Sequence, residues 1–335
     1  MDVELLRSIL TVTIQAGTSL VFATIGEIFT ERSGILNLGL EGIMIMGAVT
    51  GFAAVFHSQS LLVAVLVAML VGALLASIHA FLTISLRTDQ VVTGLALTLF
   101  GGGLASFLGQ RLGPGGKPLV GEVGPKFTKV ALPLLSDIPY IGEPLFKQDP
   151  LVYVMYLLVP LAGFYIYRTR PGLHLRAVGE NPATADAMGI SVARTRYAYT
   201  IFGGMLIGLG GAHLSLAYTP GWTENLTGGR GWIAIALVIF ATWDPFRALI
   251  GAVLFGGVNA IQFRLQAVEA IKLPGLLGWL EDILNFLKEK PAFLAMLPYL
   301  ATIVVLVAIT WWETLSKRIG APAALGLPYV REERG

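Results

Sequence analysis

The chain has 335 residues, of which 55% are hydrophobic and only 13% charged, and its mean hydropathy is +0.74. About a quarter of the residues in a soluble domain are charged, so the composition excludes an ordinary soluble protein and indicates an integral membrane protein. A net charge of +2 is too small for a protein that binds nucleic acid, and no such partner is expected. The absence of cysteine excludes disulfides and thiolate metal sites.

Apolar stretches of about 20 residues mark membrane-spanning helices. They predict an all-α polytopic membrane protein, a single transmembrane domain over 1–335, with about nine transmembrane helices (range eight to ten). The nine predicted spans are 9–29, 34–56, 61–86, 91–109, 151–167, 197–218, 231–243, 246–263 and 293–312.

The segment 168–196 carries five arginines between two apolar spans. An excess of basic residues in a short loop marks the cytoplasmic side, which fixes the orientation of the other segments. The same side is predicted for 31–33, 87–90, 243–247 and the tail after 312. The opposite side is predicted for the N-terminus, 57–60, 219–230 and two longer extracytoplasmic loops at 110–150 and 264–291.

Two halves of the chain resemble each other weakly. A glycine-bearing span followed by a Gly-Ala span occurs near 38–81 and again near 231–263. The first pair turns outside and the second inside, which favours an inverted repeat, with a first copy over about 9–109 and a second over about 197–312. In transporters such repeats place the transport path at their interface.

Polar residues at membrane depth are candidates for function. Asn37 and Glu41 share one face near the start of the second span, where Gly39 and Gly42 favour a broken or loosely wound helix that lines a path. The alternative is that Glu41 extends its side chain to the nearby cytoplasmic surface or pairs with Arg32 there.

A second candidate group lies at the predicted outer mouth of the seventh span. Glu224, Asn225 and Arg230 stand beside Trp232, and polar groups next to aromatic rings suit the recognition of a sugar or base. The alternative is an interfacial aromatic belt with an ordinary polar loop.

No catalytic or metal-binding motif occurs, and the glycine-rich stretch 113–118 lacks the spacing of a phosphate-binding loop. The chain is therefore predicted not to be an enzyme and to hold no cofactor. The loop instead contains a predicted short helix, with Asn181 as its cap, Pro182 at its first position and Gly189 as its stop. Its apolar side, which includes Ala185, could seat in a groove of a partner protein.

Two motifs carry a resemblance to a family. The stretch R-A-V-G-E-N-P-A-T-A-D-A-M-G-I-S-V resembles the cytoplasmic coupling loop of permease subunits in bacterial ABC importers of the ribose/galactose, nucleoside and branched-chain amino acid superfamily. The stretch E-R-S-G-I-L-N-L-G-L-E-G-I-M-I-M-G-A is similar to the second-span motif of its nucleoside and simple-sugar branch.

The resemblance implies a multi-pass permease of the bacterial plasma membrane that imports nucleosides or simple sugars. Its implied partners are ABC ATPase subunits that bind the ATP, a second permease subunit, a periplasmic or lipid-anchored substrate-binding protein and the lipid bilayer. Asn37, Gly39, Glu41 and Gly42 would shape the path. Docking to the ATPase would involve Arg176, Gly179, Asn181, Pro182, Ala185 and Gly189. The alternative function is an ion-coupled carrier or channel for a small polar solute.

Overall fold

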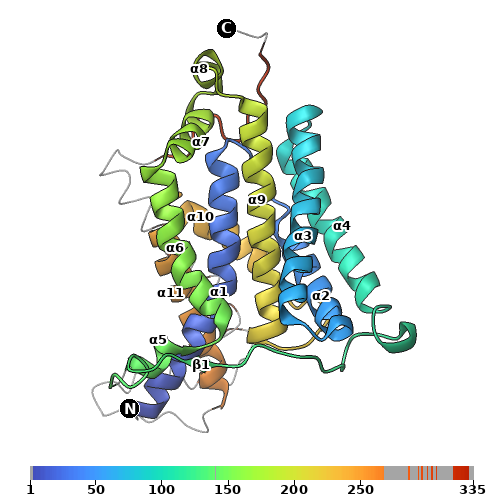
Figure 1. Cartoon of the computed structure of the whole chain (residues 1–335), viewed down its shortest axis with the longest axis vertical. Helices are drawn as coiled ribbons and strands as arrows, with labels where there is room; N and C mark the ends of the chain where they lie inside the picture. The colour runs from blue at the N-terminus through green and yellow to red at the C-terminus, as the bar shows by residue number, and fades with distance from the viewer. Residues whose placement is uncertain are drawn as a thin grey trace.

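A computed structural model describes residues 3–139, 141–267 and 320–331, together with isolated positions between 286 and 307. Helices run side by side along the long axis of the molecule (Figure 1). Six of them, within these ranges, are long and apolar enough to cross a membrane. They are α1 (Val3–Arg32), α2 (Leu40–Ser58), α3 (Leu61–Ala80) with a π turn at Phe81–Ser85, α4 (Gln90–Gly109), α6 (Pro150–Arg168), and α9 (Val192–His213) with a π turn at Leu214–Tyr218.

Two further apolar helices, α10 (Arg230–Phe240) and α11 (Pro245–Ala267), coincide with the predicted seventh and eighth spans. Asp244 caps α11 by accepting hydrogen bonds from the N–H groups of Phe246 and Arg247, both at 3.0 Å. Most of the ninth predicted span, 293–312, and most of the predicted loop 264–291 lie outside the described residues. A mostly helical membrane fold is confirmed, whereas the number nine stays a prediction.

Short elements cover the two ends of the helical layer (Figure 1). One end carries a 3-10 turn (Pro114–Gly116), α5 (Gly142–Phe146) and a two-stranded antiparallel sheet of β1 (Val130–Ala131) and β2 (Lys147–Gln148), in which Val130 pairs with Gln148. The other end carries α7 (Arg170–Glu180), α8 (Pro182–Ala187) and the tail segment 320–331.

Helix α9 lies at the centre of the layer and packs on α1, α2 and α3. It does so through glycines: a Cβ on Gly203 would lie 2.5 Å from the carbonyl oxygen of Gly26, and one on Gly204 would lie 2.5 Å from that of Gly72. In a membrane the hydrophobic effect does not drive helices together, because lipid is as apolar as their side chains. Small residues let the helix backbones approach closely and associate through van der Waals packing.

The segments predicted to share the cytoplasmic side meet at one end of the structure. Arg32 donates hydrogen bonds to the carbonyl oxygen of Trp243 and to the hydroxyl of Tyr167, and the hydroxyls of Ser85 and Tyr197 lie 2.6 Å apart. The connections after α1, α3, α6 and α10 therefore lie together, as the arginine count predicts. We refer to this as the basic end of the molecule.

The contact between α2 and α4 gives a test of the packing. A Cβ on Gly101 would lie 2.5 Å from the carbonyl oxygen of Gly42, whereas one on Gly103 would meet nothing within 4 Å. Gly101→Ala should lower the free energy of unfolding by about 1–3 kcal/mol, the usual effect of overpacking. The control Gly103→Ala, on the same helix, should be neutral or stabilising by up to about 1 kcal/mol. Thermal unfolding of the purified variants measures both, and equal effects would contradict the contact.

Candidate functional site

The chain loses its helical form between α1 and α2, although apolar residues continue through this segment, 33–39. Inside a membrane an unwound backbone is stable only where protein or water satisfies its polar groups. Here side chains from four surrounding helices and one residue of the segment itself do so. Three backbone N–H groups of the segment donate: Leu36 N to Gln90 Oε1 (2.7 Å), Asn37 N to Glu27 Oε1 (3.0 Å) and Gly39 N to Asn37 Oδ1 (2.9 Å). Two backbone carbonyls accept: Ser33 O from Arg196 Nε (3.3 Å) and Leu38 O from Thr98 Oγ1 (2.9 Å). A third carbonyl, Leu36 O, lies 3.0 Å from His79 Nε2.

The unwound segment delays the start of α2 until about half the height of the layer. Gly42, in the first turn of α2, touches Leu97 and Gly101, which lie in the middle of α4. The predicted second span began at residue 34, so that prediction placed the helix start six residues too early and too close to the basic end. The expectation of a loosely wound start with Asn37 and Gly39 in it is confirmed.

Glu41 joins the starts of two helices. Its Oε1 accepts hydrogen bonds from the Thr227 hydroxyl and from the N–H of Gly229 (2.9 Å), and its Oε2 accepts from the N–H of Gly231 (2.6 Å). These groups form the N-terminus of α10, where unpaired N–H groups and the helix dipole favour a negative charge. The alternative pairing of Glu41 with Arg32 is wrong, because Arg32 lies at the basic end.

Arg230 places a positive group at the same depth. Its Nη1 donates to the carbonyl oxygen of Ala16 (3.1 Å), midway along α1, and its guanidinium carbon lies 5.1 Å from the ring centre of Tyr218. The prediction that 219–230 lies wholly at the outer mouth is therefore wrong for its last residues. The chain after α9 turns back into the layer, and α10 begins there beside Glu41.

The remaining members of the second predicted group lie elsewhere. Glu224 accepts hydrogen bonds from Ser106 Oγ (3.3 Å) and Gln110 Nε2 (3.1 Å), at the far end of α4 from the basic end. Asn225 is exposed in the turn before α10, and Trp232 is 40% exposed in its first turn. Arg230 and Trp232 flank Gly231, whose N–H donates to Glu41 Oε2, so the structure places both near Glu41 although they are far from it in sequence. It does not bring Glu224 there.

Two buried acids of α1 were missed. Glu27 supports the unwound segment, and Glu31 Oε2 accepts a hydrogen bond of 2.6 Å from Trp243 Nε1. Both side chains are buried. Glu27 lies inside the predicted span 9–29, so a polar residue at membrane depth was the signal that could have found it.

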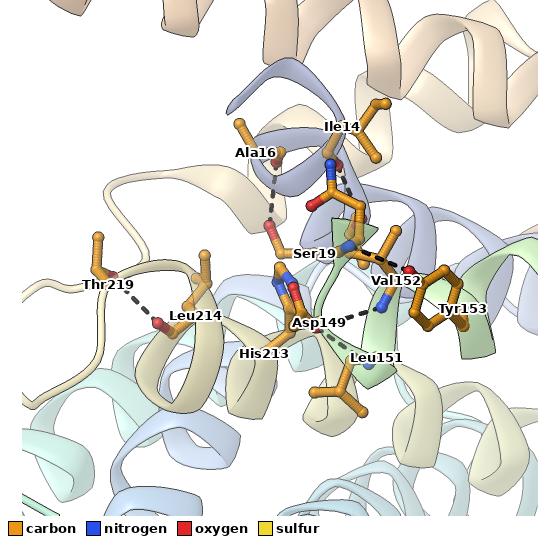
Figure 2. A network of polar contacts seen from close by, with 12 residues as sticks. Ile14, Ala16, Ser19, Asp149, Leu151, Val152, Tyr153, His213, Leu214 and Thr219 are labelled. Carbon is orange, nitrogen blue, oxygen red and sulfur yellow. Dashed lines mark hydrogen bonds and ion pairs between the residues drawn. The ribbon is translucent and has the colours of Figure 1, made fainter. Parts of the chain in front are cut away.

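A second polar contact joins the opposite end of α9 to the start of α6. Asp149 and His213, both buried, face each other with 3.7 Å between Asp149 Oδ2 and His213 Nε2 (Figure 2). Asp149 also caps α6 by accepting from the N–H groups of Leu151 and Val152. Burial acts to raise the pKa of Asp149, but His213 and the two N–H groups outweigh it and hold that pKa below its ordinary value.

The predicted helix in the arginine-rich loop is α8. Asn181 caps it by accepting from the N–H of Thr184 (2.9 Å), Pro182 is its first residue, and Gly189 follows it with a φ of 82°. The preceding helix α7 was not predicted. The exposed face of this region presents Met188, which is 79% exposed, and Ala187.

Other residues predicted to dock a partner face inward. Ala185 is buried, and a Cβ on Gly179 would lie 2.2 Å from the carbonyl oxygen of Arg32. Arg176 lies 5.7 Å from the ring centre of Tyr167. These residues therefore support the exposed face around α8 from inside and do not lie on its outer side.

The tail segment 320–331 ties this surface to the unwound segment. Ala324 N donates to Gly179 O (2.9 Å), Gly326 N donates to Gly34 O (3.2 Å), and Leu327 O accepts from Arg196 Nη1 (3.0 Å). Arg331 forms an ion pair of 3.0 Å with Asp186 on α8. One short stretch of chain thus contacts α7, α8, α9 and the start of the unwound segment.

These features define a multi-pass membrane protein whose two interrupted segments meet inside the layer, with an exposed helix at one end. The sequence pattern of the family described as "Branched-chain amino acid transport system / permease component" matches residues 8–306. The chain belongs to this family of ABC transporter permeases and is a multi-pass protein of the plasma membrane.

Curated relatives match over nearly the whole chain. TsgC13 of Haloferax volcanii, provisionally named a glucose ABC transporter permease protein, is 41% identical over 97% of this chain and 98% of its own. The nucleoside ABC transporter permease protein NupC of Lactococcus lactis is 37% identical over 94% of each chain. The guanosine ABC transporter permease protein NupQ of Bacillus subtilis is 33% identical over 99% of each.

Glu41 is the residue to test. Glu41→Ala leaves Thr227 Oγ1, Gly229 N and Gly231 N without their acceptor, and each unpaired buried donor costs about 1–3 kcal/mol. We expect uptake by the complete transporter to fall more than tenfold, with a smaller loss for Glu41→Gln, which retains one acceptor oxygen. Glu122→Gln, in the loop after α4, serves as the control and should leave uptake unchanged. Normal uptake by a stably inserted Glu41→Ala variant would contradict the assignment.

Proposed function

We propose that this permease carries nucleosides or simple sugars inward, as one subunit of a complete ABC importer. The observation that carries the proposal is the contact of Glu41 with the N-terminus of α10 at half the height of the layer. Interrupted helices that begin at membrane depth mark the solute sites of transporters. The named relatives act on glucose, nucleosides and guanosine, which supports this substrate class.

The chemistry of the site suits an uncharged solute with many hydroxyl groups. Glu41 offers a carboxylate acceptor and Arg230 a cation, and the side-chain N–H group of the buried Asn37 has no hydrogen-bond partner among the residues that the structure describes. A nucleoside or sugar hydroxyl can both donate and accept, so it can exchange hydrogen bonds with either kind of group. The aromatic ring of Trp232, in the first turn of α10, would add a surface for a sugar or base face.

The two interruptions also support the predicted inverted repeat. The order α1, unwound segment, α2, α3 is followed in the second half by α9, the turn 219–229, α10 and α11. The helix starts of α2 and α10 meet at Glu41. We interpret the two halves as related copies whose interface forms the path, with rocking of one copy against the other opening each side in turn.

The energy would come from separate ATPase subunits, because this chain is proposed to hold neither an ATPase site nor a cofactor. Met188 and Ala187 would contact the ATPase through the exposed face of α8. Movement of α8 would be transmitted to the unwound segment by the tail, in which Arg331 pairs with Asp186 of α8 and Gly326 donates to Gly34 O. A second permease subunit and a substrate-binding protein would complete the machine.

Reconstitution tests this proposal against the alternative of an ion-coupled carrier or channel. In proteoliposomes the permease with its ATPase and binding protein should accumulate radiolabelled guanosine or glucose only when ATP is present. The permease alone should accumulate neither under a proton or sodium gradient. Uphill uptake by the permease alone would overturn the proposal.

Met188 tests the docking surface. Met188→Glu places a charge on a residue that is 79% exposed, so the fold should be unaffected. The ATPase must then leave that charge uncompensated in an apolar contact, and we expect its affinity for the permease to fall at least tenfold. Met188→Leu keeps the apolar surface and should bind normally. Unchanged co-purification of the ATPase with the Met188→Glu variant would contradict the assignment.

A further inference from the structure

A groove between α6 and α9 opens beside the basic end of the molecule and shares no residue with the Glu41 site. Its volume is about 660 Å³. Phe29 of α1 forms its floor, Leu158 and Leu161 of α6 one wall, and Ala198 and Phe202 of α9 the other. Leu161 is 53% exposed, so the groove is open at the surface of three membrane-spanning helices.

The polarity of the groove changes along the helix axis. Its deeper part, nearer the middle of α6, is lined by Leu158 and Leu161. Next comes a pair of hydroxyls, those of Tyr165 and Tyr199, which lie 2.9 Å apart. At the basic end stand His174 and Arg194, both exposed.

Arg194 is available for a ligand. Its guanidinium makes no hydrogen bond or ion pair with any other residue that the structure describes, unlike its neighbour Arg196. A cation over an apolar groove within the membrane complements an amphiphile with an anionic head and an apolar tail. An uncharged polar solute would gain little from such a lining.

We infer that this groove binds one anionic phospholipid of the surrounding leaflet, with an acyl chain between α6 and α9 and the phosphate at Arg194. Basic pockets between membrane helices bind anionic lipid headgroups in this manner. The two tyrosine hydroxyls, of which that of Tyr199 donates to Pro171 O (3.2 Å), lie between the apolar part of the groove and Arg194. Because α7 begins beside the groove, the lipid would fill the space between the coupling region and the membrane.

The test measures lipid binding to the purified full-length permease by native mass spectrometry, with phosphatidylglycerol and phosphatidylcholine titrated separately. The wild-type protein should retain one phosphatidylglycerol in preference to phosphatidylcholine. Arg194→Ala should weaken phosphatidylglycerol binding about fivefold, because this is the contribution to affinity of one basic side chain at an anionic membrane surface. Ala198→Trp should fill the groove and abolish retention of the bound lipid.

The matched control is Arg87→Ala, which removes an exposed arginine from the turn between α3 and α4, outside the groove. It should leave phosphatidylglycerol binding unchanged. Equal binding of the two lipids, equal effects of Arg87→Ala and Arg194→Ala, or full lipid retention by Ala198→Trp would each overturn the inference. A change in oligomeric mass of Ala198→Trp without a change in lipid binding would instead assign the groove to a second protein chain.

Discussion

The need to satisfy every backbone polar group inside the membrane governs this structure. Where α1 ends, the chain continues without helical hydrogen bonds, and Glu27, His79, Gln90 and Thr98 supply the missing partners. The same need applies to the first N–H groups of α10, which Glu41 satisfies. Polar side chains that are costly in a membrane are thus retained because unpaired backbone would cost more.

Much of the fold could be predicted from the sequence. Long apolar stretches locate the six long helices, five arginines group the connections at one end, and the Asn181, Pro182 and Gly189 signals define α8. These features depend on local composition, which the sequence displays directly. The number of spans and the inverted repeat stay predictions, since part of the last third of the chain lies outside the described residues.

The site was predicted less well, because it depends on depth and long-range pairing. Apolar residues in 34–39 suggested a helix that starts at residue 34, whereas side chains distant in sequence hold this segment unwound. The partners of Glu41 lie 186 to 190 residues away along the chain, so no local pattern identifies them. Asp149 and His213 were missed for the same reason, since neither residue alone indicates a contact between α6 and α9.

The tail segment has a consequence for biogenesis. Its contacts with Gly179 and Gly34 can form only after every helix from α1 to α11 has been synthesised and inserted, because the tail follows them all in the chain. The surface around α8 is consequently completed late, and a truncated nascent permease would present it without this support. Assembly with a motor subunit is thereby favoured for finished chains over incomplete ones.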